Sequence, residues 1–91
     1  MGKLERAEQV NAKVVKALGR LRVEQGLSHQ ELANRAGVTR SYIGLLEKGK
    51  RRPTLEVALR LSWALGTTLS SLLAESERRV GSRTKPISRS G

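Results

Sequence analysis

Basic side chains gather between residues 40 and 52, at Arg40, Lys48, Lys50, Arg51 and Arg52. The planar fork of an arginine guanidinium can donate two parallel hydrogen bonds to a phosphate or to the paired acceptors of guanine, whereas a lysine ammonium acts as a point charge. The whole chain has 18 Lys and Arg residues against 8 Asp and Glu residues, a formal net charge of +10. This excess points to a polyanionic partner, most commonly nucleic acid, although charge that only keeps a small protein in solution stays an alternative.

A helix is predicted to begin at His29, upstream of this basic cluster. Ser28 and Glu31 have the spacing of a capping box, in which the serine oxygen accepts a backbone N–H of the first turn and the glutamate accepts the N–H of the serine. Small and apolar residues then recur at helical spacing and form a narrow stripe that another helix can approach closely: Leu32, Ala33 and Ala36.

A second short helix is predicted to follow at once. Gly37 suits the left-handed conformation that ends a helix, and Thr39 suits the cap of the next one. Ile43 and Leu46 supply the apolar face of that second helix. Two helices joined so tightly cannot lie antiparallel and must cross at a wide angle, which is the geometry of a helix-turn-helix.

Three further helices are expected around this pair. The first is predicted because apolar residues recur with a period near 3.6, at Val10, Val14, Ala17, Leu18 and Leu21. This helix is expected to end by Gly26. It contains Gly19, which costs about 1 kcal/mol relative to alanine. The fourth, between Thr54 and Gly66, is expected to face the core with Leu55, Ala58, Leu59, Ser62 and Leu65. A short fifth helix is expected over residues 69–74. No segment alternates convincingly with period two, so the fold class is expected to be all-α.

The chain is expected to hold one domain, over residues 12–74, because 91 residues are too few for two. Residues 1–11 are interpreted either as an N-terminal arm or as an extension of the first helix. Residues 75–91 are rich in Ser, Arg and Gly and contain little to bury, which predicts a basic, flexible C-terminal tail. Whether this tail follows a phosphate backbone or has no role stays open.

The segment LSHQELANRAGVTRSYIGLLE, residues 27–47, resembles the helix-turn-helix of the phage-repressor family (Cro/C1-type, or xenobiotic-response-element) of DNA-binding proteins. The likeness extends from Val14 to Leu73. The positions that carry it are Leu32, Ala33, Gly37, Val38, Ile43, Leu46 and Glu47, followed by Gly49, Lys50 and Pro53. The resemblance implies a compact, lambda-repressor-like domain of five helices with the helix-turn-helix at the second and third. It also implies a sequence-specific, double-stranded-DNA-binding transcriptional regulator, in the form of a repressor-type homodimer on a palindromic operator.

Within such a motif the second helix lies in the major groove, and its N-terminal residues meet base edges. The predicted base contacts are Arg40, Ser41 and Leu45. Arg40 suits guanine O6 and N7, with a solvated charge or a phosphate contact as the alternative. Gly44 and Leu45 depart from the family, which often has polar readers there. Leu45 could touch a thymine methyl group or pack inside the domain, and Gly44 could allow close approach to DNA.

Contacts to the DNA backbone are expected from both sides of the second helix of the motif, which we call the reading helix. The loop after that helix is basic, and the free N–H groups at the start of the preceding helix favour phosphate. The family usually has glutamine at the position of His29. The predicted backbone contacts are His29, Gln30, Thr39, Tyr42, Lys48, Lys50, Arg51 and Arg52.

Two further sets of residues are assigned structural or assembly roles. The resemblance implies that Arg22 and Glu47 form a partly buried salt bridge between the first helix and the end of the reading helix. Trp63 falls on the polar face of the fourth helix, and a large exposed aromatic residue often marks an interface. A dimerisation surface is therefore hypothesised, with a tryptophan folded over its own domain as the alternative. Its expected members are Trp63, Leu69, Leu72 and Leu73.

Composition and motifs argue against other classes of protein. The chain has one histidine, no cysteine, no glycine-rich phosphate loop and no paired carboxylates in an evident pocket, so no enzyme, cofactor, metal or small-molecule ligand is expected. No apolar run approaches the roughly 20 residues of a membrane-spanning helix, and the N-terminus lacks a signal-peptide pattern, so a cytoplasmic protein without a membrane partner is expected.

Two other functions stay open. An antitoxin or complex subunit could use the same fold mainly to bind protein, but it would not need Arg40 or the basic cluster of residues 48–52. A nonspecific nucleic-acid binder would fit the basic ends of the chain and the apolar Leu45.

Overall fold

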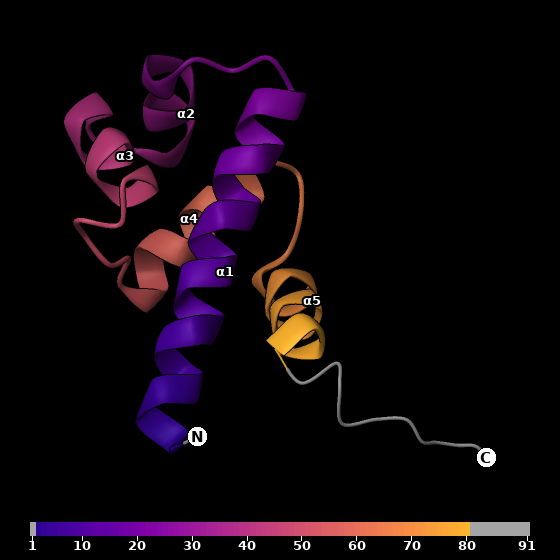
Figure 1. Ribbon diagram of the computed structural model, residues 1–91. Helices are drawn as coiled ribbons and strands as arrows, with labels where there is room; N and C mark the ends of the chain where they lie inside the picture. The colour runs from indigo at the N-terminus through magenta and orange to yellow at the C-terminus, as the bar shows by residue number, and fades with distance from the viewer. Residues whose placement is uncertain (1, 81–91) are drawn as a thin grey trace.

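The computed structural model describes residues 2–80, with the side chains of residues 2–77, and this part of the chain is all-α. Its helices are α1 (Lys3–Glu24), α2 (His29–Ala36), α3 (Arg40–Glu47), α4 (Leu55–Ala64) and α5 (Leu69–Val80). Figure 1 shows the long helix α1 running through the middle of the molecule, with α2 and α3 on one side of it and α5 on the other. The predicted order and class of the five helices are confirmed.

Helix α1 begins at Lys3, so the first residues extend this helix and do not form a separate arm. Its buried residues are Val14, Ala17 and Leu18, and Leu4 near its start is 82% exposed. The N-terminal turns of α1 therefore lie outside the core, and the C-terminal half of the helix supports the rest of the fold.

The turn between α2 and α3 is held by the residues that the sequence singles out. Ser28 Oγ accepts the N–H of Glu31 at 3.0 Å, and Glu31 Oε1 accepts the N–H of Ser28 at 2.8 Å. Gly37 ends α2 with φ at 73°, a left-handed conformation that favours glycine. Thr39 Oγ1 then accepts the N–H of Tyr42 at 3.1 Å and caps α3. These local bonds fix where α3 starts and which face it presents.

Helix α4 buries most of the face that was expected, but not its first turn. Leu55 is 71% exposed, whereas Leu61 is 1% exposed. The prediction that Leu55 faces the core is wrong because the first turn of α4 lies outside its buried stripe, which follows Ala58, Leu61, Ser62 and Leu65. Ser62 is satisfied in the interior, since its Oγ donates to the carbonyl oxygen of Ala58 at 2.7 Å.

Helix α5 is longer than expected. It continues to Val80, and Ser76 is only 3% exposed on the same face as Leu72. The expected boundary at residues 74 and 75 therefore lies inside α5, because this helix packs along α1 beyond its apolar residues. The remainder of the predicted tail, residues 81–91, lies outside the described residues.

One core joins all five helices. Helix α2 packs on α3 and α4, and α5 packs on α1 and α4. Ala33 is completely buried, as expected for a small residue where helices approach closely. The buried apolar residues are Val14, Ala17, Leu18, Leu27, Leu32, Ala33, Ala36, Ile43, Leu46, Ala58, Leu61, Leu65, Leu69 and Leu72.

Candidate nucleic-acid interface

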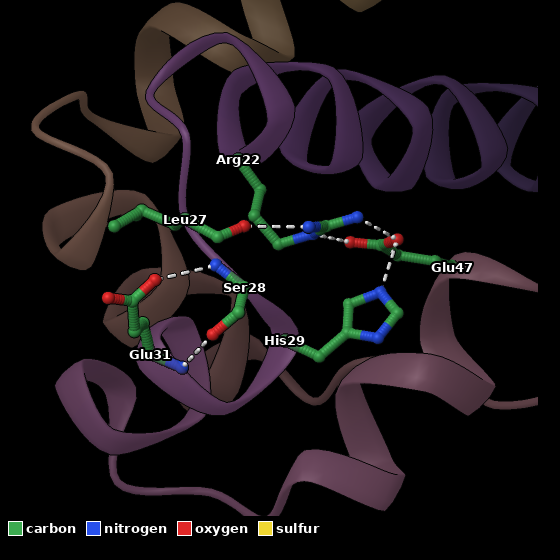
Figure 2. Close-up of polar contacts among 6 residues, drawn as sticks. All are labelled: Arg22, Leu27, Ser28, His29, Glu31 and Glu47. Carbon is green, nitrogen blue, oxygen red and sulfur yellow. Dashed lines mark hydrogen bonds and ion pairs between the residues drawn. The ribbon is translucent and has the colours of Figure 1, made fainter.

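Three charged or polar side chains from three helices meet behind the reading helix α3 (Figure 2). Arg22 Nε donates to Glu47 Oε2 at 2.7 Å, and Arg22 Nη2 donates to Oε1 at 3.0 Å. His29 Nε2 lies 3.1 Å from Oε1 of the same carboxylate. Because an ionised carboxylate only accepts, His29 Nε2 carries the hydrogen and donates it. The expected pair of Arg22 and Glu47 is present, and His29 is a third member that the sequence did not reveal.

This network keeps Glu47 ionised and orients α3. Burial raises the pKa of the Glu47 carboxyl, but hydrogen bonds from Arg22 and His29 and their charges together outweigh it, so the pKa lies below the ordinary value of 4.5. The hydrogen bond to Glu47 raises the pKa of Arg22. Arg22 also donates to the carbonyl oxygen of Leu27 at 2.7 Å, so it links the end of α3 to the loop before α2.

The exposed face of α3 carries a shallow hollow that gathers all three predicted base-contact residues. Arg40 and Ser41 come from the first turn of α3, and Leu45, one turn later, is 36% exposed. His29 joins this hollow from α2. A flexible cation, a hydroxyl and an apolar wall therefore lie side by side on one surface. We call this surface the reading hollow; it is lined by His29, Arg40, Ser41, Gly44, Leu45 and Lys48.

Gly44 has no role inside the domain that would explain it. A β-carbon at this position would meet nothing within 4 Å. Its φ is not positive, unlike that of Gly37. Glycine in the interior of a helix is less favourable than alanine by about 1 kcal/mol, so neither packing nor backbone conformation accounts for it.

The basic cluster after α3 is exposed, and both of its arginines have partners in the fold. The Arg51 guanidinium lies over the ring of Tyr42, 5.5 Å from its centroid. Arg52 Nη2 donates to Glu8 Oε2 of α1 at 3.4 Å, between side chains that are 71% and 61% exposed. Sequence reasoning missed both contacts. The ring of Tyr42 is a cation–π platform that restricts Arg51 before any ligand is bound.

A second hollow lies beside the reading hollow, between α1 and the loop after α3. It includes Lys48, Arg51 and Arg52 from the basic cluster together with residues of α1 such as Glu8 and Lys16. Lys50 is exposed but lines neither hollow. The cluster thus continues the positive surface from α3 toward α1.

The remaining predicted backbone contacts have local hydrogen bonds. Gln30 Nε2 donates to Asn34 Oδ1 at 2.9 Å on the exposed side of α2. Thr39 uses its oxygen as the acceptor of the α3 cap, which leaves its hydroxyl hydrogen available to another acceptor. Contacts of both residues with phosphate stay predictions.

Half of the expected dimerisation surface is buried in the domain itself. Leu69 and Leu72 are 8% and 3% exposed, so their assignment to an interface is wrong. They fall on the face of α5 that packs against the core, and Leu73 lies at its edge, 37% exposed. Trp63 is 64% exposed and is not folded over its own domain.

Two further properties concern metals and membranes. Within the described part of the chain, no group of three His, Cys, Asp or Glu side chains could hold a metal ion. Over the same residues, no single helix is long and apolar enough to cross a membrane. Helices α4 and α5 satisfy that length and composition only jointly, as a pair bent by 103°, and their apolar residues contribute to the core.

The helix-turn-helix of α2 and α3, with basic side chains on the exposed face of α3, is the arrangement of the helix-turn-helix class of DNA-binding proteins. A family profile described as helix-turn-helix matches residues 18–72, more than half of the chain. The chain belongs to this helix-turn-helix family, the phage-repressor (Cro/C1-type) class of DNA-binding transcriptional regulators, which are not enzymes.

Individual relatives are named as transcriptional regulators or repressors. The chain is 53% identical over 45 residues to an uncharacterised HTH-type transcriptional regulator of Methanothermobacter thermautotrophicus, a match that covers 50% of this chain and 65% of the relative. It is 34% identical over 65 residues to the cryptic phage CTXphi transcriptional repressor RstR of Vibrio cholerae, covering 71% and 59% of the two chains. The matches therefore span less than two thirds of both relatives.

A solved structure has the same fold. The crystal structure of the clp gene regulator ClgR from Corynebacterium glutamicum matches with a TM-score of 0.70 and 24% identity, covering 81% of this chain and 79% of that chain. At this identity the likeness establishes the fold alone.

Proposed function

We propose that the protein is a sequence-specific transcriptional regulator that inserts α3 into the major groove of double-stranded DNA. The observation that carries this proposal is the reading hollow, where Arg40, Ser41 and Leu45 lie together on the exposed face of α3. Arg40 donates to guanine, Ser41 to a base or a phosphate, and Leu45 contacts an apolar base edge.

The basic cluster supplies the backbone contacts in this proposal. Lys48, Lys50, Arg51 and Arg52 are exposed and follow α3 directly, so they lie where the duplex backbone passes a helix seated in the groove. Arg51 is restricted by Tyr42 before binding, which lowers the entropy lost on contact. At the other side, His29 and Gln30 occupy the first turn of α2, whose free N–H groups favour phosphate.

The regulator acts in this proposal as a repressor-type homodimer on a palindromic operator. The exposed Trp63 of α4 and Leu73 of α5 support an interface between two copies, since buried aromatic residues are common anchors of such surfaces. A relative that is named a phage transcriptional repressor supports the repressor role. Two copies would place two α3 helices about one turn of DNA apart, roughly 10 base pairs.

A random duplex pool tests the proposal. The protein is incubated with the pool at a stated salt concentration, and the retained duplexes are sequenced. We expect an enriched palindrome with two half-sites. Retention without an enriched sequence would favour nonspecific nucleic-acid binding, and no retention at all would favour a protein-binding module.

A further inference from the structure

Gly44 interrupts a row of long side chains on the exposed face of α3. Arg40 precedes it by four residues and Lys48 follows it by four, so all three lie along one face of the chain at this point. All three also line the reading hollow. The glycine therefore leaves a gap between two cations, on the surface that faces the proposed DNA.

The fold itself does not require a glycine at position 44, so the gap serves the exposed surface of α3 and not the packing of the domain. A β-carbon at Gly44 would meet nothing within 4 Å, whereas one at Gly19 of α1 would lie 3.4 Å from Glu47. Gly37 needs its left-handed backbone, but Gly44 has an ordinary helical one. Glycine is, after proline, the least favourable residue in a helix interior, so its position here suits close approach by an outside group.

The chemistry around the gap narrows the identity of that group. Leu45 forms an apolar wall beside Gly44 and donates no hydrogen bond, while Ser41 and Arg40 supply donors next to it. In the major groove, the 5-methyl group of thymine is the apolar feature that a base edge presents. A methyl group fits a site made of a leucine side chain and a bare helix backbone, whereas a purely polar base edge would leave Leu45 without a partner.

We propose that the gap at Gly44 is a subsite for the 5-methyl group of a thymine base, with Leu45 as its apolar wall. The inference rests on the proposed function, since it assumes that α3 lies in the major groove. In this proposal, part of the sequence preference comes from the lack of a side chain at Gly44. A T·A pair is then read next to the G·C pair that Arg40 contacts.

Deoxyuridine tests the subsite, because it differs from thymidine only by the missing methyl group. Each thymine of the enriched duplex is replaced in turn, and affinity is measured by fluorescence anisotropy. We expect one position per half-site at which the replacement weakens binding about fourfold, the factor that corresponds to burying one methyl group. In Gly44→Ala and in Leu45→Ala this ratio falls to about one.

Gly19→Ala is the matched control, since it adds the same methyl group to a helical glycine outside the reading hollow. It should retain the fourfold ratio. Circular dichroism checks that Gly44→Ala is folded, which is expected because its new β-carbon enters open space.

The outcomes separate the two proposals. An enriched sequence that binds equally well with deoxyuridine at every position, or a fourfold ratio that persists in Gly44→Ala, overturns the thymine subsite and leaves the regulator intact. A pool that yields no enriched sequence overturns both.

Discussion

Gly19 of α1 lies directly against Glu47 of α3, so that a β-carbon on the glycine would be 3.4 Å from Glu47 Cδ and 3.6 Å from its Cγ and Oε2. The glutamate side chain thus crosses bare helix backbone on its way to Arg22, one turn nearer the C-terminus of α1. This contact gives a packing reason for a glycine that looks unfavourable in the sequence.

The effect of a substitution at Gly19 on the free energy of unfolding should depend steeply on the size of the new side chain. The distances to Glu47 are those of ordinary contact, so alanine fits, and its better helix propensity should raise the free energy of unfolding by about 0.5–1 kcal/mol. Gly19→Leu should lower that free energy, because the longer side chain displaces Glu47 from Arg22. Urea denaturation measures both. Equal destabilisation by Ala and Leu would mean that the bare backbone itself is required.

The ion pair behind α3 should make stability depend on pH. The pKa of Glu47 is lowered in the fold, so its contribution is complete above the ordinary value of 4.5 and is lost as pH falls through the folded value. Glu47→Gln should cost about 2 kcal/mol at pH 7, in the range of hydrogen bonds to charged groups, and should flatten the loss of stability below pH 4.5.

Thermal melts from neutral to acidic pH measure this difference. Glu24→Gln serves as the control, since Glu24 is an exposed glutamate of α1 whose ion pair with Arg20, at 3.8 Å, lies on the surface. It should keep the pH dependence of the wild type. If Glu47→Gln and the wild type lost stability in parallel on acidification, Glu47 would not be the group responsible.

The local parts of this fold were predictable because single residues decide them. Ser28, Gly37 and Thr39 set the ends of α2 and α3 through bonds to residues three or four positions away. The resemblance implied the pair of Arg22 and Glu47, which is present. Two other polar contacts were not predictable, since His29 meets Glu47 and Arg52 meets Glu8 only after the chain has folded.

Spacing alone also could not say which apolar residues remain exposed. Leu69, Leu72 and Leu73 look alike in a short helical pattern, but the first two enter the core and the third lies at its edge. In α4 the same ambiguity led to the expectation that Leu55 faces the core, whereas Leu55 is exposed and Leu61 is buried. The face that a helix buries depends on where its neighbours pack, which a periodic pattern does not specify.

Arg40 and Lys50 should affect DNA binding in different ways. Arg40 lines the reading hollow, so Arg40→Ala should cost about 1–3 kcal/mol and relax the preference at one base pair. Lys50 lies outside that hollow, so Lys50→Ala should weaken all sequences alike and reduce the salt slope by about one unit. Titrations at several salt concentrations, on the enriched duplex and on a scrambled one, separate the two effects. Identical behaviour of the two variants would remove Arg40 from the base readers.

Tyr42 should act through its ring. Tyr42→Phe keeps the platform under Arg51, whereas Tyr42→Leu removes it, at a cost to DNA affinity of about 0.5–1 kcal/mol. The matched pair therefore separates the ring from the hydroxyl. If Tyr42→Phe lost as much affinity as Tyr42→Leu, the hydroxyl would be the group that contacts DNA, as a direct phosphate donor.

Charge on the exposed apolar residues of α4 and α5 should separate two copies of the chain. Trp63→Glu and Leu73→Glu place a carboxylate where a self-complementary interface would bury apolar surface, so light scattering should give a monomer mass for both. Binding to the palindrome should fall about a hundredfold, because one reading helix no longer tethers the other. Leu4→Glu is the control, since Leu4 is 82% exposed at the N-terminal end of α1. It should change neither the mass nor the affinity for the palindrome. A wild type that is monomeric both free and on DNA would remove the dimer, and single half-sites should then be the enriched sequences.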